Sequence, residues 1–263
     1  MGMQSTPLLM HRLIERGAVV SPNEEIVTAT ASGTRRQTYL ETRARAHKLA
    51  NAMRAHGLGP GDTVATFMWN SATHLETYWA CAGLGVVLHT LNIRLGRTDL
   101  EYIINHAADR MIIVDADLLP ALEVVKDVMP PVERVVVATE EGFEGWQTDL
   151  PQAIDYEAFI ADQADHCDWP ELPETSPLGL CYTSGTTGDP KGVEYEHRAQ
   201  YLHTMAVMAT DCMGLTATDT LCGIVPMFHA QGWGLPWAAL TMGMKQVMPT
   251  PLYGPGTHCA PDV

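Results

Sequence analysis

Short apolar runs alternate with helical patterns between residues 57 and 139, and this alternation limits the fold more than any other feature of the sequence. Each run is rich in Val, Ile and Leu and is short enough for a buried strand. The expected strands are 62–69, 85–90, 110–115 and 134–139, and the expected helices are 71–83, 98–107 and 118–129. The helix at 98–107 is expected to open with a capping box of Thr98 and Glu101. The alternation predicts an α/β fold of layered β-α-β units with mostly parallel sheets.

A further helix is predicted between residue 38 and Gly57, before the first of these strands. Ala46, Leu49, Ala50 and Met53 follow the spacing that places apolar side chains on one helical face. The glycine and the Gly-Pro-Gly turn that follow are typical helix stops.

The chain changes character over residues 140–177, which are acidic and interrupted by prolines. We expect a long surface connection there. After it, strands are expected at 178–183 and 220–225 and a helix at 197–211. We therefore divide the chain into a first α/β subdomain at 1–139, the acidic Pro-containing connection at 140–177, and a second α/β part at 178–263.

Composition excludes several classes of protein. The chain has 263 residues, 46% of them hydrophobic, which is enough for a sizeable core. A formal net charge of -15 would repel the phosphates of a nucleic acid, so nucleic acid is not an expected partner. The N-terminus does not look like a secretion signal, and the longest apolar run is too short to span a bilayer. The six cysteines are widely spaced without a C-x-x-C pair, which favours reduced thiols in a cytoplasmic protein.

The stretch YTSGTTGDPKGV at 182–193 is dense in glycines and hydroxyl side chains, and it follows a predicted strand. Successive N–H groups and hydroxyls can converge on one anion, and glycine lets the backbone approach it closely. A lysine near the end of the stretch supplies the compensating charge. The stretch therefore predicts a phosphate-binding loop. The residues expected to form it are Thr183, Ser184, Gly185, Thr186, Thr187, Gly188, Lys191 and Gly192.

Two common nucleotide motifs do not fit this chain. Walker A places Gly-Lys-Ser/Thr five residues after its first glycine, whereas Pro190 stands five residues after Gly185 and Lys191 precedes a glycine. The stretch GLGVVL at 83–88 lacks the third glycine of the dinucleotide-binding fingerprint. A flexible turn is the alternative interpretation of 183–191, and a solvated surface lysine is the alternative for Lys191.

Residues 182–193 resemble the phosphate loop of the adenylate-forming superfamily, which includes acyl-CoA synthetases, luciferases and the adenylation domains of peptide synthetases. The segment VPMFHAQGWGLP at 225–236 is similar to the next motif of that superfamily, at the expected distance. Upstream, TYLETRARAHKLANAMRAHGLGPGDTVATFMWNS and WACAGLGVVLHTLNIRLGRTDLEYIINHAADRMIIVD resemble the start of the same enzymes. The similarity runs from about Thr38 to about Met248. VLHTLNIRL and PMFHAQGWGLP are typical of bacterial medium- and long-chain fatty acyl-CoA synthetases.

The resemblance implies a two-step ligation that uses ATP, Mg²⁺ and coenzyme A. A carboxylate attacks the α-phosphate of ATP to give acyl adenylate and pyrophosphate, and the thiol of coenzyme A then displaces AMP. The first step brings an anion onto a polyanion, so it depends on charge neutralisation and in-line positioning. By resemblance, Thr183 helps to hold Mg²⁺, and residues Ser184 to Lys191 surround the β- and γ-phosphates.

The second motif supplies the other expected site residues. By resemblance, His229 is the catalytic residue at the carboxylate and α-phosphate end, and Ala230 and Trp233 lie where the acyl chain passes. A satisfied histidine at a strand end is the alternative for His229, and simple core packing is the alternative for Trp233. Other histidines, such as His166 and His258, lack metal-ligand spacing and are expected at the surface.

The expected substrate is a fatty acid. Amino-acid-activating relatives carry an aspartate after Phe228, where it pairs with the substrate ammonium, whereas this chain has His229 there. The residues around and after Trp233 suit an apolar tunnel, and an aryl acid is the alternative. The tunnel is expected to involve Gly232, Gly234, Leu235, Trp237, Ala238, Ala239 and Leu240.

The superfamily's enzymes are roughly twice as long as this chain. The resemblance therefore implies the N-terminal part of the large domain, with 178–263 as the truncated start of the ATP-binding part and without the C-terminal lid domain. We expect a fragment that is inactive alone. A non-catalytic nucleotide-binding remnant is one alternative, and an acyl hydrolase using Ser184 is another, although the G-x-S-x-G elbow is missing. Uncovered apolar surface near the C-terminus predicts self-association, for which a homodimer is one form.

Overall fold

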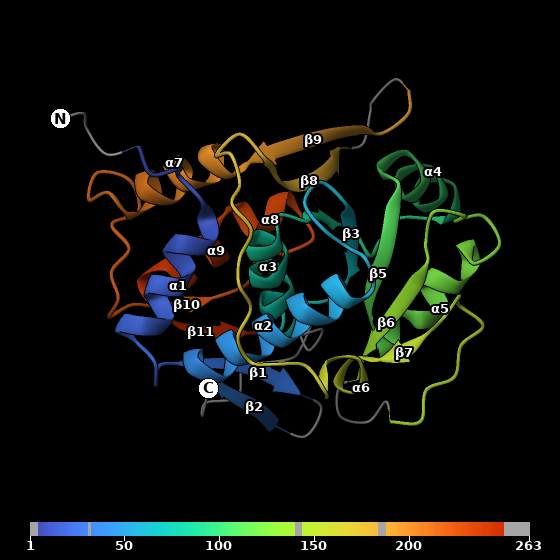
Figure 1. The fold of residues 1–263 in the computed structure, drawn as a ribbon, viewed down its shortest axis with the longest axis horizontal. Coiled ribbons are helices and arrows are strands. Elements are labelled where there is room, and N and C mark those ends of the chain that lie inside the picture. The colour runs from blue at the N-terminus through green and yellow to red at the C-terminus, as the bar shows by residue number, and fades with distance from the viewer. Residues whose placement is uncertain (1–4, 31–32, 140–143, 184–187, 250–263) are drawn as a thin grey trace.

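The computed structural model describes residues 5–30, 33–139, 144–183 and 188–249. Two β-sheets are surrounded and separated by helices (Figure 1). The larger sheet has the order β7-β6-β5-β3-β4-β8-β9, and all of its neighbouring strands are parallel except β8 and β9. Its strands are β3 (Thr63–Phe67), β4 (Val87–Thr90), β5 (Asp109–Asp115), β6 (Arg134–Ala138), β7 (Ile154–Asp155), β8 (Pro177–Thr183) and β9 (Lys191–Glu196). The predicted α/β fold with mostly parallel strands is confirmed.

The smaller sheet has the order β10-β11-β1-β2 and joins the two ends of the chain. Val27 of β1 is in register with Val247 of β11 in a parallel pair, while β1 and β2 form an antiparallel hairpin. Its strands are β1 (Glu25–Thr30), β2 (Gly33–Thr38), β10 (Thr220–Cys222) and β11 (Lys245–Met248). Strands from both sides of the 140–177 stretch therefore share each sheet. The domain boundaries drawn from the sequence stay a prediction.

The five helices predicted from the sequence are found, one of them broken and one with a different start. The helices are α1 (Met10–Val20), α2 (Tyr39–Ala55), α3 (Ala72–Leu84), α4 (Arg97–Ala107), α5 (Leu119–Leu122), α6 (Tyr156–Ile160), α7 (His197–Met208), α8 (Ala230–Trp233) and α9 (Leu235–Met242). Of these, α1, α6, α8 and α9 were not predicted. The capping box expected at Thr98 is wrong, because α4 follows Gly96 without a side-chain cap. A capping box instead forms between Thr38 and Glu41 at the start of α2. The helix predicted at 118–129 is broken into α5 and two flanking 3₁₀ turns.

Hydrophobic cores cover both faces of the larger sheet. Met111 and Ile113 of β5 pack in the cluster that includes α2 and α3, whereas Ile112 and Val114 pack in the cluster that includes α4. Burial on both faces explains why the strands read as continuous apolar runs. Every residue of α3 is buried, so this helix lies in the centre of the molecule (Figure 1).

The described part of 140–177 is more than a surface connection. It includes β7 and α6, and it buries Cys167 and Leu172. The indole Nε1 of Trp169 donates to Oε1 of Glu15 at 3.3 Å. These contacts fasten the stretch to α1.

The structure also bears on the expectations from composition. Cys81, Cys167, Cys181, Cys212 and Cys222 are free thiols, and Cys259 lies outside the described residues. None of the helices within the described ranges combines the length and apolar character that crossing a bilayer requires.

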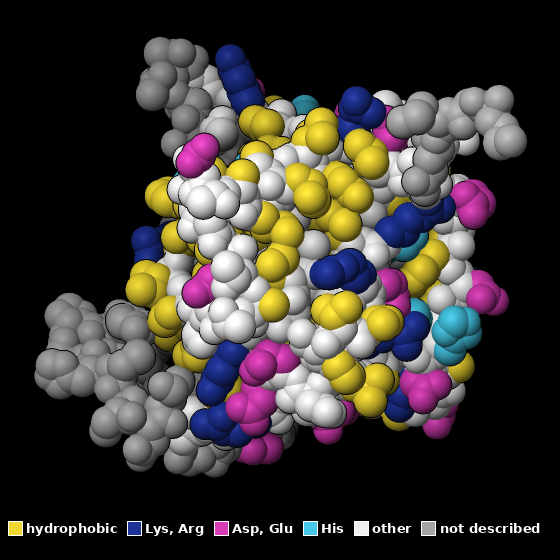
Figure 2. All heavy atoms as spheres, turned by 90° about the vertical axis from the view of Figure 1, so that its left-hand side faces the viewer, with side chains coloured by type: hydrophobic (Ala, Val, Ile, Leu, Met, Phe, Trp, Pro, Cys, Tyr) yellow, Lys and Arg dark blue, Asp and Glu magenta, His cyan; other side chains and the backbone are white. Residues whose placement is uncertain are grey.

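Apolar side chains are exposed on the side that carries α1 and α7, as Figure 2 shows. On these two helices the large exposed apolar residues are Val19, Val20, Leu202 and Met205. Near the C-terminal end, Ile224 is 66% exposed. Uncovered apolar surface is thus present, and self-association stays a prediction.

Candidate functional site

The predicted phosphate loop connects the two antiparallel strands of a hairpin. Thr183, at the end of β8, is paired with Lys191, at the start of β9, and both side chains are exposed. The hydroxyl of Thr183 donates to the carbonyl oxygen of Lys191 at 3.5 Å. Gly188 has φ of +152° and open space beside it. The two ends of the loop are therefore held together as the base of a turn. Ser184, Gly185, Thr186 and Thr187 lie outside the described residues.

Sequence reasoning missed β9, because an edge strand with an exposed face has no continuous apolar run. Most of its residues are exposed, including Val193 at 40%. Gly192, which was expected to allow close approach, lies opposite Tyr182 in this pairing. The first residues after the loop thus extend the sheet.

Tyr182 fixes the strand just before the loop. Its hydroxyl lies 2.6 Å from Nδ1 of His106 near the end of α4. Burial raises the pKa of Tyr182 to about 12, so the phenol stays protonated beside the imidazole. Neither residue was singled out from the sequence, because their contact joins segments 76 residues apart.

A buried polar pair lies beside Tyr182. The ring of His89 is 5.1 Å from the Tyr182 ring, and its Nδ1 atom is 2.9 Å from Oδ2 of Asp109. Both side chains are fully buried. Burial raises the pKa of Asp109, and the contact with His89 opposes this shift. This pair links β4 to the start of β5 across β3, which lies between them in the sheet.

The segment that leads to His229 is held by two residues from the region of α3. The Asn70 amide donates to the carbonyl oxygens of Gly223 and Val225 at 2.7 and 2.9 Å and accepts from the Met227 N–H at 2.7 Å. The Tyr78 hydroxyl donates to the Met227 carbonyl oxygen at 2.8 Å. These bonds satisfy the backbone of an irregular segment. The path into the second motif is therefore rigidly defined.

The residues that follow His229 form a turn in the left-handed region. The φ angles are +45° at Ala230, +51° at Gln231, +63° at Gly232, +57° at Trp233 and +70° at Gly234. Glycine adopts such angles freely, whereas each other residue is strained there. Backbone strain of this kind concentrates at functional sites. The sequence gives no signal for it beyond its two glycines.

This turn leaves the predicted substrate residues at the surface of the second motif. His229 is exposed, Ala230 is half-buried and Trp233 is 57% exposed. Core packing, the alternative for Trp233, is therefore wrong. His166 is exposed as expected, and His258 lies outside the described residues.

No tunnel runs through the described residues expected to line it, because α9 turns most of its side chains into the core. Leu235 and Gly232 line a small apolar cavity together with Asn70 and Met227. In contrast, α9 packs against α1. Its fully buried residues are Trp237, Ala238, Ala239 and Leu240, so the prediction that they line a tunnel is wrong in this structure.

The structure brings the two motifs together at Cys181. Burial raises the pKa of this thiol, and the Thr90 hydroxyl at 3.3 Å and the backbone N–H groups of Ala230 and Gln231 oppose the shift. Cys181 precedes Thr183 by two residues on β8. The turn after His229 is thus packed directly on the strand that ends at the phosphate loop.

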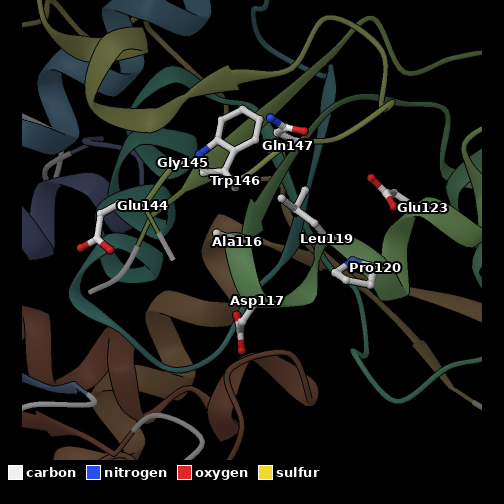
Figure 3. Close-up of a pocket in the computed structure, with 9 residues that line it drawn as sticks. All are labelled: Ala116, Asp117, Leu119, Pro120, Glu123, Glu144, Gly145, Trp146 and Gln147. Carbon is white, nitrogen blue, oxygen red and sulfur yellow. The ribbon is translucent and has the colours of Figure 1, made fainter. Parts of the chain in front are cut away.

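A larger hollow lies elsewhere, at the carboxyl end of β5 (Figure 3). It measures about 340 Å³, and none of its lining residues belongs to either motif. Figure 3 shows the carboxylates of Asp117, Glu123 and Glu144 at different edges of the hollow. They do not converge on one ligand position. Within the described ranges, no group of three or more His, Cys, Asp or Glu side chains is arranged to hold a metal ion.

The phosphate-loop hairpin and the turn after His229 both lie within a long part of the chain that matches one known protein family. Residues 14–257 match the family described as AMP-binding enzyme. The chain belongs to the AMP-binding enzyme family. Its sequence is 39% identical to a medium-chain-fatty-acid–CoA ligase of Ectopseudomonas oleovorans over 250 residues, covering 95% of this chain and 46% of the relative. It is also 39% identical to a long-chain-fatty-acid–CoA ligase of Thermus thermophilus, covering 97% of this chain and 46% of that relative.

Further relatives and solved structures that resemble this chain are named for several acids. A 3-methylmercaptopropionyl-CoA ligase of Ruegeria lacuscaerulensis is 38% identical over 95% of this chain and 46% of the relative. A solved anthranilate CoA ligase has the same fold, with a TM-score of 0.77 and 24% identity over 94% of this chain and 46% of its own. A long-chain-fatty-acid-CoA ligase from Archaeoglobus fulgidus gives a TM-score of 0.78 at 21% identity, over 95% and 48%. This chain spans about half the length of the curated relatives it matches.

Proposed function

We propose that this chain forms the phosphate-binding and carboxylate-binding parts of an ATP-dependent acyl-CoA ligase whose substrate is a fatty acid. The observation that carries the proposal is the packing of the turn after His229 on β8, where Gln231 lies against Gly179, next to the phosphate-loop hairpin. This packing places the second motif beside the end of β8, where Thr183 is the last residue. The two fatty-acid–CoA ligases that are 39% identical to the chain support the same reaction.

The phosphate end of the proposed site is the β8–β9 hairpin. Residues Ser184 to Gly188 would surround the β- and γ-phosphates, and Lys191 would neutralise part of their charge. Mg²⁺ would arrive with ATP, because magnesium is typically held by substrate phosphates, water and few protein oxygens. The exposed hydroxyl of Thr183 fits as its protein donor. The ion would neutralise phosphate charge when bound.

The acid end of the proposed site is the turn that begins at His229. The exposed imidazole would meet the carboxylate and α-phosphate, and Ala230 and Trp233 would border the acyl chain. A large exposed indole suits an alkyl chain, since it offers apolar area without a charged partner. Short sulfur-containing and aryl acids are competing substrates, because relatives named for such acids share the family or the fold.

We further propose that this chain binds ATP without completing the ligation. Isothermal calorimetry with Mg²⁺-ATP should detect binding, and Lys191→Ala should weaken it about tenfold, as loss of a charge-assisted contact predicts. Lys48→Ala on α2 is the matched control. Pyrophosphate release should stay at background with fatty, sulfur-containing and aryl acids. Robust pyrophosphate release that requires one of these carboxylic acids would overturn the proposed inactivity. The rates of release would then rank the acids as substrates. Failure of the chain to bind ATP would overturn the proposed site.

The acyl hydrolase alternative makes a separate prediction. If Ser184 were an activated nucleophile, a fluorophosphonate probe would label it. We expect no labelling at this serine by mass spectrometry. Labelling there would favour the hydrolase over the ligase.

We place the ligase reaction in the cytoplasm, where ATP and coenzyme A are found, and we propose a homodimer as the associated form.

A further inference from the structure

Gln231 lies at the centre of the left-handed turn. Its side chain is polar and yet buried. Its side chain is 1% exposed, and its φ of +51° places it in a region that disfavours side chains. A residue other than glycine is disfavoured in this conformation, because its Cβ comes too close to the following carbonyl oxygen. Such a residue persists only where its surroundings hold it there. The contacts of Gln231 therefore show what maintains the turn.

One contact fixes the orientation of the Gln231 amide. The indole Nε1 of Trp237 lies 3.0 Å from Oε1 of Gln231. An indole N–H is only a donor, so the amide oxygen must face Trp237 and the amide nitrogen must face the opposite way. The orientation of the Gln231 amide is thus set by its hydrogen bond to Trp237.

The amide nitrogen lies over the backbone of β8. A Cβ atom placed on Gly179 would stand 1.7 Å from Nε2 of Gln231. Glycine is therefore required at this strand position so that the amide can fit. The nitrogen has no hydrogen-bond partner among the described residues, and its contact with the strand is one of close packing.

The same turn also covers a thiol on β8. Cys181 is 6% exposed, and the N–H groups of Ala230 and Gln231 are near enough to its Sγ to oppose the rise in pKa that burial causes. Gly179 and Cys181 alternate with Leu180 on the strand, so both contacts lie on one face of it. Two contacts on one strand face fix the position of the turn along β8.

We propose that Gln231, seated in the gap left by Gly179, is the positioning residue that holds the His229–Trp233 turn in register with the phosphate loop. The effect of this residue on ligand binding rests on the proposed function, whereas its role in holding the turn does not. When the amide is removed, the strain in the turn is released, His229 and Trp233 move away from β8, and Cys181 loses its cover. The β8–β9 hairpin keeps its own pairing and stays in place.

The first test needs no ligand. Gln231→Met keeps the length of the side chain but removes the acceptor for Trp237, and Gly179→Ala fills the gap from the other side. N-ethylmaleimide labelling of Cys181, followed by mass spectrometry under native conditions, should accelerate about tenfold in both variants, because a local opening exposes the thiol. Cys81 is fully buried in α3 and reports global unfolding in the same molecules.

A matched control separates positioning from general stability. Gln246 is a fully buried glutamine on β11, whose amide donates to the Tyr39 hydroxyl at 2.9 Å. Gln246→Met should lower stability without changing the ratio of Cys181 to Cys81 labelling. If Gln231→Met leaves that ratio at the wild-type value, or if Gln246→Met raises it equally, the inference is wrong.

The second test uses calorimetry with Mg²⁺-ATP and decanoate. Gln231→Met should weaken decanoate binding in the presence of ATP about tenfold and ATP binding by a smaller factor, because His229 meets only the α-phosphate and the β8–β9 hairpin stays in place. Gln246→Met should change neither. If the wild-type chain binds neither ligand, the proposed function fails while the labelling ratio still decides the positioning role. If the wild type binds both and Gln231→Met binds them equally well, the positioning role fails alone.

Discussion

The phenolic oxygen of Tyr182 lies 2.6 Å from Nδ1 of His106 and ties the phosphate-loop strand to the end of α4. Tyr182 directly precedes Thr183, the first residue of the proposed phosphate site. Because burial raises the pKa of Tyr182 to about 12, the phenol stays protonated throughout the physiological range. The strand is therefore anchored to a helix at the point where the loop begins.

Removing this hydroxyl should loosen the base of the loop. Tyr182→Phe keeps the ring that packs near His89 and deletes the bond to His106. We expect the free energy of unfolding to fall by about 1 kcal/mol, the usual net value of one hydrogen bond. ATP affinity should fall as well. Urea unfolding and calorimetry measure the two effects, with Tyr201→Phe on α7 as the control. An unchanged ATP affinity would show that the anchor does not serve the loop.

Glu15 is expected to control stability in acid. It accepts from Arg43 at 2.6 Å, His47 at 2.9 Å and Trp79 at 3.1 Å. Burial opposes its ionisation, but the hydrogen bonds from His47 and Arg43 prevail and lower its pKa from 4.5 to about 2. The stabilisation is therefore present above about pH 4.5 and is lost as the pH falls towards 2.

Glu15→Gln should consequently lower the free energy of unfolding at pH 7 by about 2 to 3 kcal/mol, since a neutral amide accepts less strongly. The difference from wild type should shrink between pH 4.5 and 2. Chemical denaturation at several pH values measures it. The control is Glu171→Gln, whose side chain is 91% exposed beside Arg12 and should matter little. A difference independent of pH would contradict the assignment.

Protonation of His74 should also make the protein less stable as the pH falls, and this loss should begin at a higher pH than the loss caused by Glu15. It is fully buried between the Trp69 carbonyl and the Thr66 hydroxyl, both at 2.9 Å. Burial lowers its pKa from 6.5 to about 4, and the bond to Trp69 partly opposes this shift. As the pH falls through 6.5 the unfolded chain takes up the proton first, so stability is lost between about 6.5 and 4. His74→Asn should be less stable at pH 7.5 but should lose less stability between pH 6.5 and 5 than wild type. An equal loss in both proteins would assign the effect to other histidines.

Gly17 should tolerate no side chain. A Cβ atom there would stand 1.7 Å from the carbonyl oxygen of Leu240, where α1 crosses α9. Gly17→Ala must separate the two helices, and we expect a loss of about 3 kcal/mol in the free energy of unfolding. Gly59→Ala, which meets no atom within 4 Å, is the control and should stay near wild type. Thermal unfolding of both variants tests the close approach.

The sequence by itself determined the strands that are buried on both faces. The runs around Val64, Ile112 and Val136 carry enough apolar residues to be recognised without any knowledge of their neighbours. The same local information was sufficient for α2, α3 and α4, and the motifs at 182–193 and 225–236 were sufficient for the family. Signals of this kind reside within a few consecutive residues.

Only the tertiary structure decided the features that depend on distant partners. Val27 lies in β1 because β11 is its parallel neighbour, 220 residues along the chain, and β9 is a strand because β8 offers it an edge. The left-handed turn at Gln231 is disfavoured locally and exists because Trp237 and Gly179 receive its side chain. In each case the stabilising free energy comes from contacts that local sequence does not encode, so packing overrides propensity.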